Sequence, residues 1–420
     1  MFGSSGRRSK SIRRSRRIGR RGGKSSRLRS LNFGAILKIS GIVVAAAALV
    51  LVIIFVIVPL LGGKSITPVA QVSPTPSVTF TPIATEDMSA TAEELSAITS
   101  NSINDPYIFG SQIVFSTGDN TKTSPTLDTI AIYDMSTQQT TNVEGITKKY
   151  DQLYEPKIDD KYMVYLDCKT PDVSKNAYGG AVCGYDRSTK KQFVMREYLY
   201  GKPKVTLSGD YALWLQQTNN GTDKLYLYYL PTEECTTIEV FVNAPFFISA
   251  PYMSDDSIIY VQPKDQNKVV DTNTSSSLTD VQICIIPLKN KGDAERVFYI
   301  PGTYVYEPLI KGNDIVYLDG DRDYNSNLMY CSKSGDSFTQ PVAIAQGVLN
   351  YYIGDGFVVY TKDDAVFIYY FKDGSTGTLS SGTTRALLAG TNGKDVIWYD
   401  ITGSAVDTTA PDVLMHILVP

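Results

Sequence analysis

The 420-residue chain divides its charge unevenly: residues 1–64 hold 14 Lys and Arg and no acidic residue, whereas residues 65–420 hold 26 basic and 43 acidic residues, a formal charge of −17. This acidic part disfavours nucleic acid and other anionic polymers as partners, because like charges repel. The single histidine, His416, excludes any site that needs two histidines within one chain. The five cysteines include no Cys-x-x-Cys pair and give no support for a zinc site.

Residues 1–34 combine Arg, Ser and Gly with few apolar side chains, and are predicted to be a disordered basic tail. Residues 35–62 are predicted to form a transmembrane helix. Their central run, residues 39–61, has 23 residues without a charge and rises roughly 34 Å, enough to cross a hydrocarbon core of about 30 Å. This run is longer than a signal-peptide core, and no small-x-small cleavage site follows it, which favours an uncleaved signal-anchor.

Basic residues beside a single span stay on the cytoplasmic side. The sequence therefore predicts a single-pass protein of the cell membrane, with its N-terminus cytoplasmic, residues 39–61 in the lipid bilayer and the remainder extracellular. We expect the basic tail to contact anionic lipid head groups. Residues 63–92 are rich in Pro, Ser and Thr, which predicts an extended extracellular linker. Residues 93–420 then form the ectodomain.

The ectodomain repeats one short pattern, seen most clearly in residues 307–319, EPLIKGNDIVYLD. A turn leads into an apolar run that ends in an aromatic residue. The seven aromatics are Phe115, Tyr165, Trp214, Tyr260, Tyr317, Tyr360 and Trp398. The intervals between them, 38 to 57 residues, bracket the period of a four-stranded propeller blade. The predicted fold is all-β, a seven-bladed β-propeller, or a six-bladed one if the short sixth or seventh unit is degenerate.

Each unit divides into four strands, expected in the second unit at residues 155–158, 162–166, 181–185 and 191–195. Five units carry a proline near their start, where a strand needs no ladder donor. These prolines are Pro106, Pro156, Pro203, Pro251 and Pro308. The last unit reaches the C-terminus after three strands. We therefore expect residues 94–99, which lie before the first unit, to supply its fourth strand and close the ring.

The Tyr-rich third strands that end in "YD" resemble those of TolB-like and related WD40-like bacterial propellers. The best matches are IYDMSTQQ from Ile132 and GYDRSTKK from Gly184. The resemblance covers residues 93–420 and implies a binding platform. It carries over no catalytic residue, and the Gly-His and Trp-Asp pairs of true WD40 repeats are absent from the sequence.

One acidic loop, residues 319–327 (DGDRDYNSN), alternates oxygen-bearing side chains as a calcium-binding EF-hand loop does. The candidate metal ligands are Asp319, Asp321, Asp323 and Asn325. The loop departs from that motif, because Tyr324 replaces its glycine and Tyr330 its final glutamate. The alternative interpretation is a solvated hairpin rich in turn-forming Asp and Asn. Calcium is the one cofactor that the sequence suggests.

A Ser-His-Asp triad would have to use His416, which lies in an apolar final strand, so a structural histidine is the better interpretation. No catalytic residue is therefore assigned. Cys168 and Cys183 flank one hairpin in the second unit, where they either form a disulfide or remain free. The other three cysteines are expected to be small core residues.

These features favour a surface-displayed, non-enzymatic propeller that binds an envelope protein or a polysaccharide through its loops and the mouth of a central channel. One alternative is a polysaccharide-active hydrolase or lyase that uses channel carboxylates, for which the sequence offers only Glu155 and Glu307 near the expected place. Another is a transmembrane signal-relay sensor whose basic tail contacts a cytoplasmic partner. The repeat itself specifies architecture and not a ligand.

Overall fold

The computed structural model describes fourteen stretches of the chain: residues 85–99, 103–118, 126–170, 179–218, 222–242, 249–254, 256–263, 281–288, 298–301, 305–320, 326–335, 337–380, 385–401 and 413–419. The predicted tail and transmembrane segment, and the first part of the predicted linker, lie outside these stretches. Within them, no helix is both long enough and apolar enough to cross a membrane.

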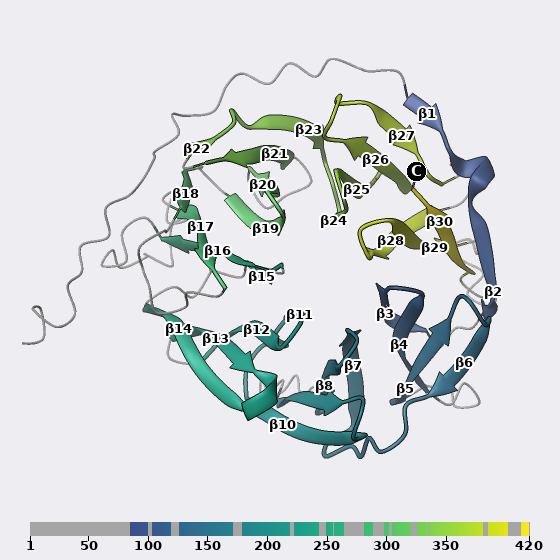
Figure 1. The fold of residues 1–420 in the computed structure, drawn as a ribbon, viewed down its shortest axis with the longest axis vertical. Helices are drawn as coiled ribbons and strands as arrows, with labels where there is room; N and C mark the ends of the chain where they lie inside the picture. The colour runs from purple at the N-terminus through teal and green to yellow at the C-terminus, as the bar shows by residue number, and fades with distance from the viewer. Residues whose placement is uncertain are drawn as a thin grey trace, which may run out of the picture. The chain divides into compact units, whose positions relative to one another are not determined.

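The described strands form seven separate sheets, arranged as the blades of a propeller (Figure 1). From inner to outer, blade one consists of β3 (Asn104–Phe109), β4 (Gln112–Gly118), β5 (Leu127–Asp134) and β6 (Gln139–Asn142). Blade two consists of β7 (Gln152–Ile158), β8 (Tyr162–Cys168), β9 (Gly180–Asp186) and β10 (Lys191–Tyr198). Blade three consists of β11 (Val205–Ser208), β12 (Tyr211–Gln216), β13 (Thr222–Tyr229) and β14 (Glu234–Val242). Blade four consists of β15 (Tyr252–Met253), β16 (Ser257–Pro263), β17 (Val281–Pro287) and β18 (Phe298–Pro301). Blade five consists of β19 (Val305–Lys311), β20 (Asp314–Asp319), β21 (Asn327–Ser334) and β23 (Val342–Gln346), and the short strand β22 (Ser337–Phe338) also pairs with β21. Blade six consists of β24 (Asn350–Ile353), β25 (Phe357–Lys362), β26 (Ala365–Tyr370) and β27 (Thr376–Thr378). Blade seven consists of β28 (Arg385–Thr391), β29 (Asp395–Ile401), β30 (Val413–Leu418) and β2 (Glu93–Thr99).

Two N-terminal strands close the ring. β2 pairs antiparallel with β30, so it is the outer strand of blade seven, as the sequence predicts. Before it, β1 (Thr85–Asp87) pairs in parallel with β27, the outer strand of blade six. A single 3-10 turn, Ser89–Thr91, joins the two strands. The stretch 85–92 therefore belongs to the propeller, although its composition resembles that of the predicted linker.

The seven aromatics that define the repeat are all buried, each with at most 6% of its surface exposed. Each lies on the second strand of its blade, where alternation turns it into the seam with a neighbouring blade. Trp214 and Trp398 are among the largest fully buried side chains of the described residues. Since truncating a buried aromatic to alanine typically costs about 3–5 kcal/mol, each of these positions contributes substantially to the stability of its blade.

The turns between third and fourth strands explain the "YD" motif. Asp134 Oδ1 accepts hydrogen bonds from the Ser136 and Thr137 N–H groups at 2.8 and 3.3 Å. Asp186 Oδ1 accepts the equivalent bonds from Ser188 and Thr189 at 2.8 and 3.1 Å. The hydroxyl groups of Ser136 and Ser188 also donate to these carboxylates, and their bonds, followed by the backbone bonds, stabilise the ionised form and lower the pKa of both aspartates. The aspartate of the "YD" motif thus stabilises the turn between the third and fourth strands.

Candidate functional site

The inner strands of the seven blades lie around the axis of the ring (Figure 1). Each contacts the inner strand of the next blade, and β28 contacts β3 to complete the circle. One edge of an inner strand is bonded to the second strand of its blade, and adjacent blades pack on either side. Because neighbouring blades cover both faces of an inner strand, we interpret a side chain that stays exposed in the middle of such a strand as facing the axis.

Three inner strands share an irregular feature at an acidic residue followed by proline. Asp105, Glu155 and Glu307 have φ of +51°, +49° and +49°, and the pairing register of β3, β7 and β19 shifts at these positions. Such shifts are β-bulges, which re-aim side chains. A left-handed backbone at a non-glycine residue costs about 1–3 kcal/mol unless its surroundings hold it. The same bulge and positive φ occur in three blades, which indicates that they are a regular part of this fold.

Neighbouring blades satisfy the backbone groups that the bulges free. Asp105 Oδ2 accepts a hydrogen bond from the Glu155 N–H at 3.2 Å, which ties blade one to blade two. Ser249 Oγ, at the start of blade four, accepts one from the Glu307 N–H at 2.7 Å. The Tyr351 hydroxyl donates to the Glu307 carbonyl oxygen. The bulges thus fix the acidic residues by contacts between blades.

Lysine side chains join these acids near the axis. Lys202 Nζ lies 2.9 Å from Glu155 Oε1. Lys204 Nζ, in blade three, lies 3.8 Å from Glu307 Oε1, in blade five, so this contact passes over blade four. Lys157 Nζ donates to the Val205 carbonyl oxygen. A contact that skips a blade requires both side chains to reach inward.

Tyr352, on the inner strand of blade six, completes the group. Its pKa is raised to about 12, mainly by burial and to a smaller extent by the charges of Glu155, Asp105 and Glu307 on three other blades. Its side chain is nevertheless 36% exposed. A side chain surrounded by protein on several sides, yet open to solvent, fits a position facing the axis. We call the following seven residues the axial cluster: Asp105, Glu155, Lys157, Lys202, Lys204, Glu307 and Tyr352.

Partial desolvation shifts the titration of several members. It raises the pKa of Asp105, with the nearby Lys202 opposing and Glu155 reinforcing the effect. Burial lowers the pKa of Lys157, with Glu155 opposing. For Lys202, burial favours the neutral amine, but the charge of Glu155 and its hydrogen bond prevail and raise the pKa. Perturbed groups gathered in one place are a signature of functional sites as well as of structural ion pairs.

The axial cluster offers hydrogen-bond donors and acceptors side by side, with an aromatic ring among them. Sequence reasoning found Glu155 and Glu307 but missed Asp105, Lys202, Lys204 and Tyr352. A signal was present for two of these, because Asp105 and Lys202 directly precede the repeated prolines, as the two glutamates do. Tyr352 has no such mark, because blade six lacks the proline.

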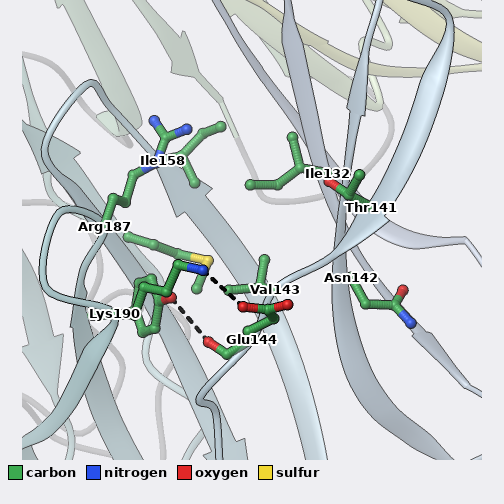
Figure 2. Close-up of a pocket in the computed structure, with 10 residues that line it drawn as sticks. Ile132, Thr141, Asn142, Val143, Glu144, Ile158, Arg187 and Lys190 are labelled. Atoms are coloured by element: carbon green, nitrogen blue, oxygen red, sulfur yellow. Dashed lines mark hydrogen bonds and ion pairs between the residues drawn. The ribbon is translucent and has the colours of Figure 1, made fainter.

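A second feature is a pocket of about 310 Å³ between blades one and two. Arg187 and Lys190 form one wall, facing Thr141 and Asn142 (Figure 2). Lys190 Nζ is paired with Glu144 Oε2 at 2.7 Å. Arg187 donates to Gln112 Oε1 at 2.6 Å and to a backbone carbonyl of blade two. These charges are used in joining the blades, so we interpret the pocket as part of their seam.

Most of the predicted calcium loop lies outside the described residues, including Asp321, Asp323 and Asn325. Asp319 ends β20, where it pairs in register with Asn327 on β21. In the stretches that the structure describes, no group of three or more His, Cys, Asp or Glu is arranged to hold a metal ion. Calcium at this loop stays a prediction.

The disulfide alternative is wrong. All five cysteines are free, and Cys168 and Cys183 are buried at different levels of the β8–β9 hairpin. In the register of these strands, Cys183 faces Tyr165 and Cys168 faces Gly180. The Cys168 thiol instead contacts the Tyr198 hydroxyl at 3.0 Å. The physical reason is the register, which places the two sulfur atoms on separate cross-strand pairs.

His416 has a structural partner. Its Nε2 lies 2.8 Å from Asp395 Oδ1, and this contact links β30 to the start of β29. The other carboxylate oxygen of Asp395, Oδ2, accepts a hydrogen bond from Asn392 Nδ2 at 2.8 Å. The histidine thus helps to hold the last strand in blade seven.

No family model and no curated protein matches the sequence. Among solved structures, the β-propeller domain of the trilobed protease from Pyrococcus furiosus matches with a TM-score of 0.52 and 13% identity, over 76% of this chain and 95% of that one. An oligogalacturonate lyase in complex with manganese matches with a TM-score of 0.52 and 11% identity, over 80% and 96%. TolB from Acinetobacter baumannii matches with a TM-score of 0.41 and 14% identity, over 65% and 67%.

The trilobed protease domain is described as having an open velcro topology, whereas β2 closes the ring of this chain. Likenesses at such low identity establish the fold alone. The described residues form a seven-bladed, all-β propeller, which is the fold that the resemblance to TolB-like propellers implies.

Proposed function

We propose that this protein is a single-pass membrane protein that displays its propeller outside the cell and binds an envelope protein or polysaccharide through the axial cluster, without catalysing a reaction. The observation that carries the proposal is the convergence of polar side chains from blades one, two, three, five and six on the axis. Binding sites commonly combine a rigid scaffold with a few well-placed polar groups.

The proposed anchor is supported by the uncharged run at residues 39–61 and by the basic residues that precede it. Strand β1 lies in the last part of the predicted linker and β2 follows directly after it, and the two strands pair with blades six and seven. A domain that is closed by its own N-terminal strands holds the inner strands of its ring in place.

The acids of the cluster favour binding over catalysis. Glu155 is held by its ion pair with Lys202, and an oxygen of Asp105 is engaged by the Glu155 N–H. A general acid or base needs its oxygens free to reach a substrate proton. Groups already engaged in structural contacts can still hydrogen-bond a ligand through their remaining lone pairs.

A polysaccharide-active enzyme is the second candidate. The observation that favours it is the raised pKa of Asp105 beside Glu155, since glycosidases pair a carboxyl group of raised pKa with an ionised carboxylate. Incubation of the protein with envelope glycan separates the two functions. A binding protein leaves the chain length of the glycan constant, whereas a hydrolase or lyase shortens it with time.

The test of the binding proposal uses the full-length protein, immobilised in detergent and exposed to solubilised envelope extract. Wild type is compared with a variant carrying Glu307→Gln and Tyr352→Ala, and with Lys190→Ala, which alters the seam between blades one and two. We expect a component retained by wild type and by Lys190→Ala to be lost from the axial variant. Equal retention by all three proteins would refute the axial site. Repetition in calcium and in chelator tests the loop at residues 319–327.

A further inference from the structure

The side chains around the axis differ in character from one side to the other. Blades one, two, three and five contribute the charged members of the axial cluster. In the middle of the inner strands of blades six and seven, Tyr352 on β24 and Leu387 on β28 are exposed at 36% and 42%. Arg385, which begins β28, is also exposed, but it pairs with Asp364 at 3.0 Å and adds no unpaired charge. Ligand sites commonly combine apolar or aromatic side chains with a small number of polar groups. The axis therefore suits a molecule that has both an apolar face and a polar edge.

The charged side is balanced. It contains three carboxyl groups, of Asp105, Glu155 and Glu307, and three amino groups, of lysines in blades two and three. Two of the carboxylates already form ion pairs with these lysines. A charged ligand would have to break such a pair, or leave one charge unpaired in a partly desolvated place, and both changes are costly. An uncharged ligand avoids either cost.

Hydroxyl groups fit this surface because each can donate to a carboxylate and accept from an ammonium group. A pyranose ring carries hydroxyls around its edge and a face of C–H groups. The face can lie on the ring of Tyr352 and the side chain of Leu387, while the edge meets Glu155, Lys202 and Glu307. Charged peptides and acidic glycans lack this match.

We propose that the axial cluster binds an uncharged oligosaccharide segment, with Tyr352 and Leu387 contacting its apolar face and the paired carboxylates and lysines bonding its hydroxyls. This assignment rests on the proposed function, because it names the class of ligand for the same site. It favours a neutral glycan over a protein partner and over an acidic or basic polysaccharide.

The test is isothermal titration calorimetry of the full-length protein, in a detergent without a sugar head group. Three hexasaccharides of matched length serve as probes: an uncharged hexamer of N-acetylglucosamine, an anionic hexamer of galacturonate and a cationic hexamer of glucosamine. We expect the uncharged hexamer to bind at least about tenfold more tightly than either charged one. Tighter binding of a charged hexamer would overturn the assignment.

Variants locate the contact. Tyr352→Ala is expected to weaken binding of the uncharged hexamer about tenfold, and Tyr352→Phe, which keeps the ring, to stay within about threefold of wild type. Leu418→Ala is the matched control, since Leu418 is 61% exposed on β30 and lies away from the inner strands. The fluorescence of the buried Trp214 and Trp398 shows whether each variant is folded. An unchanged affinity in folded Tyr352→Ala would overturn the proposal.

The capture experiment separates this inference from the proposed function. If the axial variant loses an envelope protein while no hexamer binds wild type, the glycan assignment is wrong and the binding function stands. If the axial variant loses nothing from the extract and no hexamer binds, both are wrong. If the uncharged hexamer binds and is shortened with time, the ligand class is right and the non-enzymatic function is wrong.

Discussion

Asp223 provides a quantitative test of how the propeller interior treats charge. It lies on β13 in blade three, is 3% exposed, and pairs in register with Phe241 on β14. Burial raises its pKa to about 6, and a hydrogen bond from the Thr218 backbone opposes this only in part. The ordinary value is 3.8, so the folded protein binds more protons than the unfolded chain between these two values. Stability therefore falls as pH rises through this window.

The magnitude follows from linkage: a difference of about two pKa units is worth about 3 kcal/mol. The full benefit of the neutral carboxyl group is present below pH 3.8, and it is lost once the pH exceeds about 6. Asp223→Asn keeps the shape of the side chain and removes its titration. The variant is thus expected to lose the part of the pH dependence that belongs to Asp223, and to be more stable than wild type at pH 8.

Urea unfolding of both proteins at pH 4 to pH 8 measures this difference, because the titration of all other groups is shared and cancels. Trp214 fluorescence reports on the same blade, since its residue is fully buried on β12. Thr140→Ala, at an exposed position of β6 that carries no titrating group, is the control and should leave the pH dependence unchanged. If wild type and Asp223→Asn respond to pH identically, the reasoning about burial at this site is refuted.

Three further predictions concern the frame of the propeller. Leu95→Ala, in the closing strand β2, should lower the free energy of unfolding by about 2–4 kcal/mol in urea titrations, because Leu95 packs with Ile108 and Leu414. A loss below about 0.5 kcal/mol would contradict the closure of the ring by β2. Glu307→Gly should be more stable than Glu307→Ala by about 1 kcal/mol, since both lose the same side chain and only alanine keeps the strain at positive φ; equal stability would refute that strain. Thiol titration of the unreduced protein in denaturant should count five free cysteines, whereas three would indicate a disulfide.

The blades could be predicted because their signals are local. A turn, an alternating apolar run and a buried aromatic recur within short stretches. The strands expected in the second unit all exist, with each element extended by one to three residues at its ends. Closure by residues 94–99 also followed from counting strands, since a ring with one missing strand needs the other terminus to supply it. The structure confirms this pairing in β2 and β30.

The strand β1 was not predictable, because the sequence TED has no strand signal of its own. Its pairing with the short outer strand β27 depends on the position of blade six relative to the N-terminal segment, which only the closed ring provides. The same holds for the axial cluster. Lys204 and Glu307 are more than 100 residues apart in sequence, and no local sequence pattern predicts their ion pair.

The most direct test of the central claim, that ligand binds at the axis of the propeller, is site-specific photo-cross-linking in intact membranes. A benzophenone amino acid is placed at position 352 in one protein, and at position 194 in another as control. Val194 is exposed at 47% on β10, the outer strand of blade two. The account predicts a discrete light-dependent adduct from position 352 and none from position 194. An adduct from position 194 with none from position 352 would contradict it, and would move the binding surface to the outer edges of the blades.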